Sequence, residues 1–140
     1  LINGRFYLKE NFITKELTIA RMKKTQLVPA KLIKIVKNSL DEDKAQGTIV
    51  IDLNGKSSLT DYVVIASGNS HRHVGAIADH LRLKIKEFGI RNVSVEGQPQ
   101  CNWVLIDAGD VIIHLFQPEV REFYDIEKMW GVSALSKSGA

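Results

Sequence analysis

The segment Asp61–Ser67 constrains the fold of this 140-residue chain more than any other part of it. Its centre reads Val-Val-Ile-Ala, so a strand formed here would carry apolar side chains on both faces. A strand with two apolar faces is typical of the interior of a sheet that helices cover on at least one side. The segment therefore predicts a sheet with helices packed on it.

Two helical patterns flank this strand in the sequence. The first begins at Pro29, a residue suited to the first turn of a helix, and runs to about Lys44, with Gly47 as its end. The second follows the break Gly68-Asn69-Ser70, which supplies an N-cap, and ends at Gly89. Their apolar positions recur every three or four residues. These positions are Leu32, Val36 and Leu40 in the first helix and Val74, Ile77, Ala78, Leu81, Ile85 and Phe88 in the second.

The remaining elements complete an α/β domain. Further strands are predicted at Thr48–Leu53, before an Asn54-Gly55 turn, and at Arg91–Val95, Asn102–Asp107 and Asp110–Phe116. Pro118 opens a last helix that ends at Gly131, with Val120, Phe123, Tyr124, Glu127 and Trp130 along one side. The order α-β-β-α-β-β-β-α predicts a single domain over residues 29–131, with a mixed sheet of about five strands and flanking helices.

The two ends of the chain differ from this domain in composition. Residues 1–28 are expected to be a leader or tag outside the fold, because Leu1 is not a natural start and Met22 is a better one. Residues 132–140 are small and polar and are expected to form a flexible tail.

The excess of positive over negative charge is confined to the leader. Residues 1–24 hold six basic and two acidic side chains, which leaves 13 basic and 14 acidic ones in the rest of the chain. Proteins that hold phosphate backbones usually show a basic face. The nearly neutral domain is therefore not expected to bind nucleic acid directly.

The cysteine count and the hydropathy pattern bear on location. Cys101 is the only cysteine, so no disulfide can form within the chain, and a lone thiol fits a reducing compartment. No apolar run reaches the roughly 18 residues that a membrane span needs. The protein is expected to be cytoplasmic.

Nucleotide chemistry is the enzymatic alternative. A turn such as Gly68-Asn69-Ser70, between a strand and a helix, can bind phosphate through free backbone N–H groups. Nucleotidyltransferases combine it with two carboxylates on the next strand that hold Mg²⁺. Here the next strand reads Arg-Asn-Val-Ser-Val-Glu, and Asp107 and Asp110 flank a turn, where aspartate is common. We therefore expect no enzyme and no cofactor.

Metal and nucleophile sites are also weakly supported. His71 and His73 point in different directions, and His73 and His80 are seven residues apart, about 10 Å along a helix. These histidines are interpreted as solvated or capping side chains, and no metal is expected. Cys101 with His114 would be a nucleophile and base, but no third group that could orient the base is evident.

The hairpin around Trp103 leaves two registers open. A two-residue Ala108-Gly109 turn places Trp103 opposite His114, and a three-residue turn that begins at Asp107 places it opposite Ile113. In both, one face is wholly aliphatic and the other carries the tryptophan. Trp103 is then either a core residue or an exposed interface anchor.

Acidic side chains lie close to Trp103 in this arrangement. Glu96, Asp107 and Asp110 could form an acidic patch at the sheet edge, while the charges of the last helix are interpreted mostly as a solvated face. An acidic patch beside an exposed aromatic residue suits a basic protein partner.

Six sequence blocks, in this order and spacing, resemble the iojap-related ribosomal silencing factors. The blocks are Gly-Lys-Ser-Ser-Leu-Thr-Asp-Tyr (55–62), Ala-Ser-Gly-Asn-Ser-His-Arg-His-Val (66–74), Ile-Ala-Asp-His (77–80), Val-Glu-Gly (95–97), Trp-Val-Leu-Ile-Asp-Ala-Gly-Asp-Val-Ile-Ile-His (103–114) and Pro-Glu-Val-Arg-Glu-Phe-Tyr-Asp-Ile-Glu-Lys-Met-Trp (118–130). The resemblance as a whole spans about Pro29 to Gly131.

The resemblance implies a fold and a function. The fold would be similar to that of nucleotidyltransferases without their catalytic carboxylates. The protein would bind the large ribosomal subunit through ribosomal protein uL-fourteen, block joining of the small subunit and lower translation when nutrients are scarce, with a role in ribosome biogenesis as a further expectation. The family also implies a homodimer.

The resemblance also implies site residues. Trp103 matches the family tryptophan that contacts the ribosomal protein. Asp107, Glu96, His73, Arg121 and Tyr124 match recurring motif positions and are expected at the partner-binding site, whereas His71 stands where relatives often have serine and receives no role.

Overall fold

The computed structural model describes residues 28–131, and the predictions for residues 1–27 and 132–140 lie outside this range. Residues 28–42 are helical, so Val28, which was assigned to the leader, belongs to a helix. The predicted order of elements is confirmed over the described range. The further elements are β1 (Gln46–Asp52), β2 (Tyr62–Ser67), α2 (His71–Phe88), β3 (Ser94–Glu96), β4 (Trp103–Asp107), β5 (Val111–Phe116), α3 (Pro118–Tyr124) and the 3₁₀ helix η1 (Ile126–Trp130).

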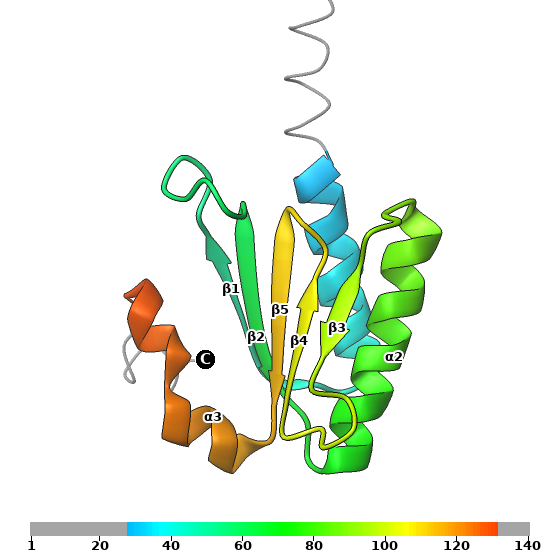
Figure 1. Cartoon of the computed structure of the whole chain (residues 1–140), viewed down its shortest axis with the longest axis vertical. Coiled ribbons are helices and arrows are strands. Elements are labelled where there is room, and N and C mark those ends of the chain that lie inside the picture. Colours follow the sequence, from blue (N-terminus) through cyan, green and yellow to red (C-terminus); the bar gives the residue numbers. More distant parts are fainter. Residues whose placement is uncertain (1–27, 132–140) are drawn as a thin grey trace, which may run out of the picture.

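The strands within residues 28–131 form one mixed sheet of five, in the order β1-β2-β5-β4-β3. The pair β2 and β5 is parallel, and the other neighbours are antiparallel. Helix 28–42 and α2 lie on one side of the sheet, whereas α3 and η1 lie toward the other (Figure 1). β2 is thus an interior strand with a covered face on each side, as its two apolar faces predict.

The main core lies between the sheet and the two long helices. The helical positions predicted to be apolar are buried, with Leu32 and Val36 fully inaccessible and Leu40 1% exposed. The second helix has the predicted caps: the Ser70 side chain accepts the N–H of His73, and Gly89 is left-handed. The strand side chains in this core are Val64, Ala66, Val104, Ile106, Val111, Ile113 and Leu115.

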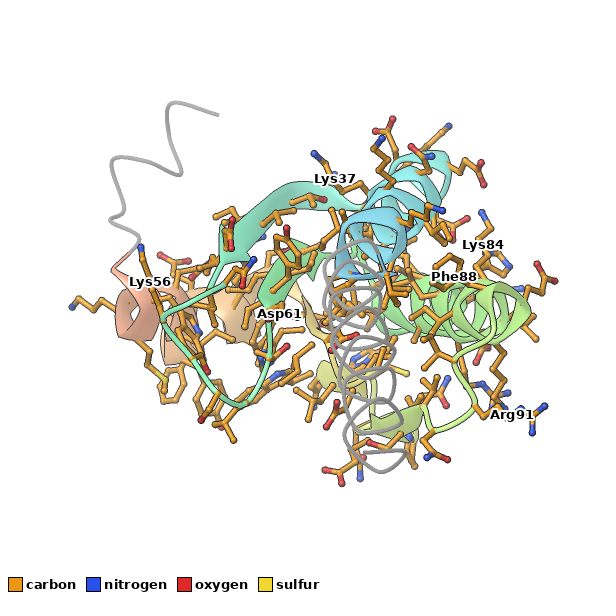
Figure 2. All side chains as sticks on the ribbon, turned by 90° about the horizontal axis from the view of Figure 1, so that it is seen from above. Lys37, Lys56, Asp61, Lys84, Phe88 and Arg91 are labelled. Atoms are coloured by element: carbon orange, nitrogen blue, oxygen red, sulfur yellow. The ribbon has the colours of Figure 1, made fainter. Side chains whose placement is uncertain are left out.

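Polar contacts connect α2 to the end of helix 28–42 and the residue that follows it. Lys84 donates to Glu42 at 2.5 Å, and His80 contacts the Asp43 carboxylate at 2.8 Å. Figure 2, seen from above, shows Lys84 and Phe88 on α2 well away from Lys56 and Asp61 of the β1–β2 loop. This loop begins with the predicted Asn54-Gly55 turn, which the bond from the Lys56 N–H to the Leu53 carbonyl closes at 2.8 Å.

A second, smaller core lies on the opposite face of the sheet. Val63 and Ile65 of β2 meet Phe116 of β5 there, and Ile126 of η1 covers them. The last helix is not continuous to Gly131 as predicted. Asp125 is left-handed (φ 43°) and separates α3 from η1. The break places Ile126 and Glu127 in buried positions while Phe123 remains 82% exposed.

Two predicted boundaries were wrong for local backbone reasons. The first helix ends before Gly47, because Lys44 is left-handed (φ 58°) and Ala45 donates back to the Leu40 carbonyl. Gly47 instead lies inside β1, where the pairing with β2 shifts register. The third strand is also shorter than predicted, since Ser94–Glu96 alone pairs with β4.

Neither predicted register of the hairpin is correct. Trp103 pairs with Phe116, because the turn is wider than two or three residues. The Ala108 N–H donates to the Val111 carbonyl at 3.0 Å, and the Asp107 carboxylate accepts the Gly109 N–H at 2.9 Å. The shift from the two-residue register is two positions, an even number, so Trp103 and His114 still share a face.

Candidate partner-binding face

Part of the sheet face that carries Trp103 remains accessible beside η1 and α3. Glu96 pairs with Leu105 and Leu105 with His114, so these three form one row across β3, β4 and β5. Glu96 is exposed, while the other two are half-buried. We call this surface the Trp103 face. Its members are Glu96, Trp103, Leu105, Asp107, His114 and Tyr124.

Trp103 lies in a cluster of rings and is half-buried. Its ring stacks on Phe116 with centroids 5.0 Å apart and approaches Tyr124 at 5.1 Å. Trp103 is thus neither a fully buried core residue nor a fully exposed anchor. One part of the ring packs on the second core, and another part is accessible.

A hydrogen bond fixes the orientation of the indole. The Trp103 Nε1–H donates to Nδ1 of His114 at 3.0 Å. Because Trp103 can only donate, His114 must accept through Nδ1 and carries its own proton on Nε2 when neutral. Burial lowers the pKa of His114 to about 4, which keeps the ring in this accepting form at neutral pH.

Aromatic side chains extend the face beyond the sheet. Tyr124 is 54% exposed and contacts both Trp103 and Phe123. Phe123 meets the Tyr124 ring edge-on at 5.1 Å and is 82% exposed. Large exposed aromatic side chains beside a partly buried tryptophan are typical of protein interfaces.

Carboxylates lie at two places near the Trp103 face: Glu96 lines a pocket with Trp103, and Asp107 stands at the far end of β4. The Glu96 carboxylate makes no hydrogen bond or ion pair within residues 28–131, whereas the Asp107 carboxylate caps its own turn by accepting the Gly109 N–H. At the same end of the sheet as Asp107, burial and the neighbouring Asp61 carboxylate raise the pKa of Asp110. The face therefore offers negative charge to a partner.

Arg121 is engaged within the chain. Its Nε donates to buried Glu127 at 2.6 Å, and its terminal nitrogens donate to Ser67 Oγ at 2.9 Å and to the Gly47 carbonyl at 2.7 Å. A Cβ at Gly47 would lie 2.9 Å from Arg121, so glycine there gives the guanidinium room. These bonds attach α3 and η1 to the ends of β1 and β2. The sequence pattern indicates mostly a solvated face for the charged side chains of the last helix. Glu127 does not fit that interpretation, because it is fully buried.

His73 lies on α2, on the helix-covered side of the sheet, and not with the Trp103 face. Its Nδ1 accepts the Asn69 N–H at 2.9 Å, and its Nε2 donates to the Asp43 carbonyl at 2.7 Å. The structure thus places this predicted contact residue against the turn that follows helix 28–42, where it fastens the start of α2.

Two N–H groups of the Gly68-Asn69-Ser70 turn are used within the chain. Gly68 donates to the Phe116 carbonyl at 2.9 Å, and Asn69 donates to His73. A Cβ at Gly68 would lie 2.8 Å from Val74, so packing accounts for this glycine. These two N–H groups are therefore not available to a phosphate.

Cys101 and His114 bond to different partners. The Cys101 thiol donates to the Gln98 carbonyl at 2.7 Å, and burial together with the Asp79 charge raises the pKa of this thiol. His114 is engaged by Trp103. Within residues 28–131, no three histidine, cysteine or acidic side chains gather as metal ligands would, and no helix there is long and apolar enough to cross a membrane.

Sequence reasoning missed three residues that shape the face. Leu105 and His114 lie on it because they alternate with core positions along β4 and β5. This alternation can be read from the sequence once it is known which residues of the two strands face the same side. The burial of Glu127 had no such signal, because it depends on the left-handed Asp125.

Comparison with known proteins identifies the family of this chain. Residues 26–138 match the family model described as ribosomal silencing factor during starvation, RsfS. This chain belongs to the RsfS family. It is 51% identical over 111 residues to the ribosomal silencing factor RsfS of Zymomonas mobilis. The aligned residues cover 79% of this chain and 84% of that protein.

Two further matches agree with the RsfS assignment. A crystal structure of a Chromobacterium violaceum protein has a TM-score of 0.71 and 36% identity, covering 74% of this chain and 87% of that one. A mouse protein named mitochondrial assembly of ribosomal large subunit protein 1 is 37% identical over 94 residues, which are 65% of this chain and 41% of that protein. As a member of the RsfS family, the chain is a ribosome-associated regulator of translation.

Proposed function

We propose that this chain represses translation by binding the large ribosomal subunit at ribosomal protein uL-fourteen with its Trp103 face. The bound protein occupies a surface that the small subunit needs, so joining is blocked and translation falls when nutrients are limited. The mechanism is steric, and no covalent bond is made or broken.

The observation that carries this proposal is the Trp103 face itself. A rigid, half-buried tryptophan beside exposed Tyr124 has the composition of an interface hot spot. The ring is already held by Phe116 and His114, so little side-chain entropy is lost on binding. Trp103, Tyr124, Glu96 and Asp107 are the proposed contact residues.

Arg121 and His73 act differently in this proposal. Arg121 holds α3 and η1, and therefore Tyr124, against the sheet. His73 holds α2 to the residues that follow helix 28–42. Both support the face from inside the domain.

The name of the mouse relative supports the choice of subunit, since that protein is described by its part in assembly of the large one. The carboxylates at the Trp103 face support a basic protein partner, because complementary charge raises the association rate and selects against phosphate-rich surfaces.

Sedimentation with isolated subunits tests the proposal. The wild-type chain should sediment with large subunits and lower the fraction that joins small ones. Trp103→Ala should weaken binding at least about 10-fold, while circular dichroism shows an intact fold. Leu83→Ala, at an exposed leucine of α2, is the matched control and should bind normally.

Two results would contradict the proposal. One is a wild-type chain that stays free of large subunits, and the other is a folded Trp103→Ala variant that still blocks joining. If Trp103→Ala does not fold, Leu105→Glu tests the same face at a half-exposed position. Light scattering of the free chain tests the homodimer that the family resemblance implies.

A further inference from the structure

A small pocket opens on the Trp103 face, next to the tryptophan. Glu96, Gly97, Trp103 and Leu105 line it, and its volume is about 350 Å³. This is near the lower end of the range of ligand pockets, roughly 300 to 1,000 Å³. The paired residues Glu96 and Leu105 form its side toward β3 and β4.

Gly97 forms a close backbone contact at this pocket. Its φ of +88° belongs to the left-handed region, and a Cβ there would lie 2.1 Å from the Trp103 carbonyl oxygen. No residue with a side chain could keep this approach. The backbone therefore passes against β4 without adding a side chain to the space beside the indole.

The groups around the pocket differ in chemistry in a way that selects a ligand. Leu105 and the Trp103 ring give apolar walls. Glu96 adds a carboxylate that has no partner within residues 28–131. The indole N–H is already donated to His114, so Trp103 has no donor left to offer an anion. The pocket thus combines apolar walls with negative charge.

We infer that this pocket binds the side chain of an arginine that the basic partner inserts beside Trp103. Arginine buries its methylene stem along apolar surface and keeps its charge at the rim. Its planar guanidinium can pair with the Glu96 carboxylate through two N–H groups, and it stacks on aromatic rings better than lysine does. The inference rests on the proposed function, because it names the feature of the partner that this face recognises.

The charge at the pocket favours a protein over RNA as the source of the ligand. A phosphate group brought to the same place would meet the carboxylate of Glu96 and be repelled. A ribosomal protein offers cationic side chains without that repulsion.

Nuclear magnetic resonance with a short peptide tests the pocket directly. The probes are acetyl-Gly-Arg-Gly-amide, the same peptide with neutral citrulline, and the lysine peptide, each titrated into the full ¹⁵N-labelled chain. The arginine peptide should shift the Trp103 indole signal and the amides of Glu96, Gly97 and Leu105. The citrulline peptide should not, and the lysine peptide should do so more weakly.

Variants of the chain make this test specific. Glu96→Gln should abolish the shifts while leaving the spectrum of the fold intact. Glu87→Gln makes the same change at an exposed residue of α2, on the other side of the sheet, and should behave as wild type. Equal shifts with citrulline, shifts elsewhere in the chain, no shifts, or shifts of the pocket signals by an RNA oligomer would each overturn the inference.

Binding to large subunits separates this inference from the proposed function. Glu96→Gln should weaken binding roughly 5- to 10-fold and reduce its dependence on salt. Wild-type affinity for this variant, together with loss of binding by Trp103→Ala, would remove the arginine pocket and leave the function standing. If the arginine peptide shifts the pocket signals but the wild-type chain does not bind large subunits, the proposed function fails and the pocket's affinity for arginine stands.

Discussion

Trp103 and His114 lie on adjacent strands and share a hydrogen bond of 3.0 Å in which the indole donates and the imidazole accepts. They are not directly paired, since Trp103 is opposite Phe116 and His114 is opposite Leu105. The bond therefore runs diagonally across the hairpin and connects the orientation of the tryptophan to the protonation of the histidine.

Acidification should weaken the fold through His114. Its pKa is lowered from 6.5 to about 4 by burial, so below pH 6.5 the unfolded chain takes up a proton that the folded chain refuses until about pH 4. The free energy of unfolding should fall over this window by about 1 to 2 kcal/mol, after allowance for solvent near the ring. Urea unfolding at several pH values measures it. His114→Phe should remove this part of the slope, and an unchanged slope would show that other groups cause it.

Breaking the Arg121–Glu127 pair should be costly. Arg121→Met leaves the carboxylate of fully buried Glu127 without its guanidinium, at a cost of about 3 kcal/mol or more in unfolding free energy. The double variant Arg121→Met, Glu127→Leu should recover much of that loss, because it leaves no buried charge. Denaturant unfolding of the three chains gives the coupling. A loss below about 1 kcal/mol for Arg121→Met would contradict the buried-pair interpretation.

Gly97→Ala should be more damaging than an alanine at another left-handed glycine. Gly97 and Gly109 have φ values of +88° and +83°, but a Cβ meets the Trp103 carbonyl at Gly97 and nothing within 4 Å at Gly109. Gly109→Ala should cost about 1 kcal/mol from backbone strain alone. Gly97→Ala should lower stability by at least about twice as much and alter the fluorescence of Trp103. Equal losses in thermal unfolding would mean that the chain relaxes around the contact.

Tyr124→Ala should impair binding more than stability. The ring is 54% exposed, so its loss should change the unfolding free energy by less than about 1 kcal/mol, yet it removes one wall of the aromatic cluster. We expect large-subunit binding to weaken about 10-fold in sedimentation. Met129→Ala, at a residue of η1 that is 76% exposed, is the control. Equal binding by both variants would place Tyr124 outside the interface.

Periodicity and caps were enough to predict most of the architecture. The burial of Leu32, Val36 and Leu40 follows from their spacing on one helix face, and the ends of α2 follow from Ser70 and Gly89. Such features are local, so the residues that specify them are neighbours in the sequence.

What could not be predicted depends on contacts that are distant in the chain or on rare backbone states. The hairpin register depends on two hydrogen bonds in the turn, in which the Val111 carbonyl accepts the Ala108 N–H and the Asp107 carboxylate accepts the Gly109 N–H. The break after α3 depends on a left-handed aspartate, and the role of Gly47 depends on Arg121, which is more than 70 residues away. Periodicity alone could not decide whether Trp103 is exposed, because the answer depends on where α3 and η1 lie.

The central position of the last strand has a consequence for synthesis of the chain. β5 is made after the other four strands of the described sheet but lies between β2 and β4. Until residue 116 has emerged, β2 has no partner on that side, and its Val-Val-Ile-Ala backbone is an open edge. Such edges readily pair with other chains. A nascent chain that stalls before this point should therefore be prone to aggregate, and the sheet can close only after residue 116 has been made.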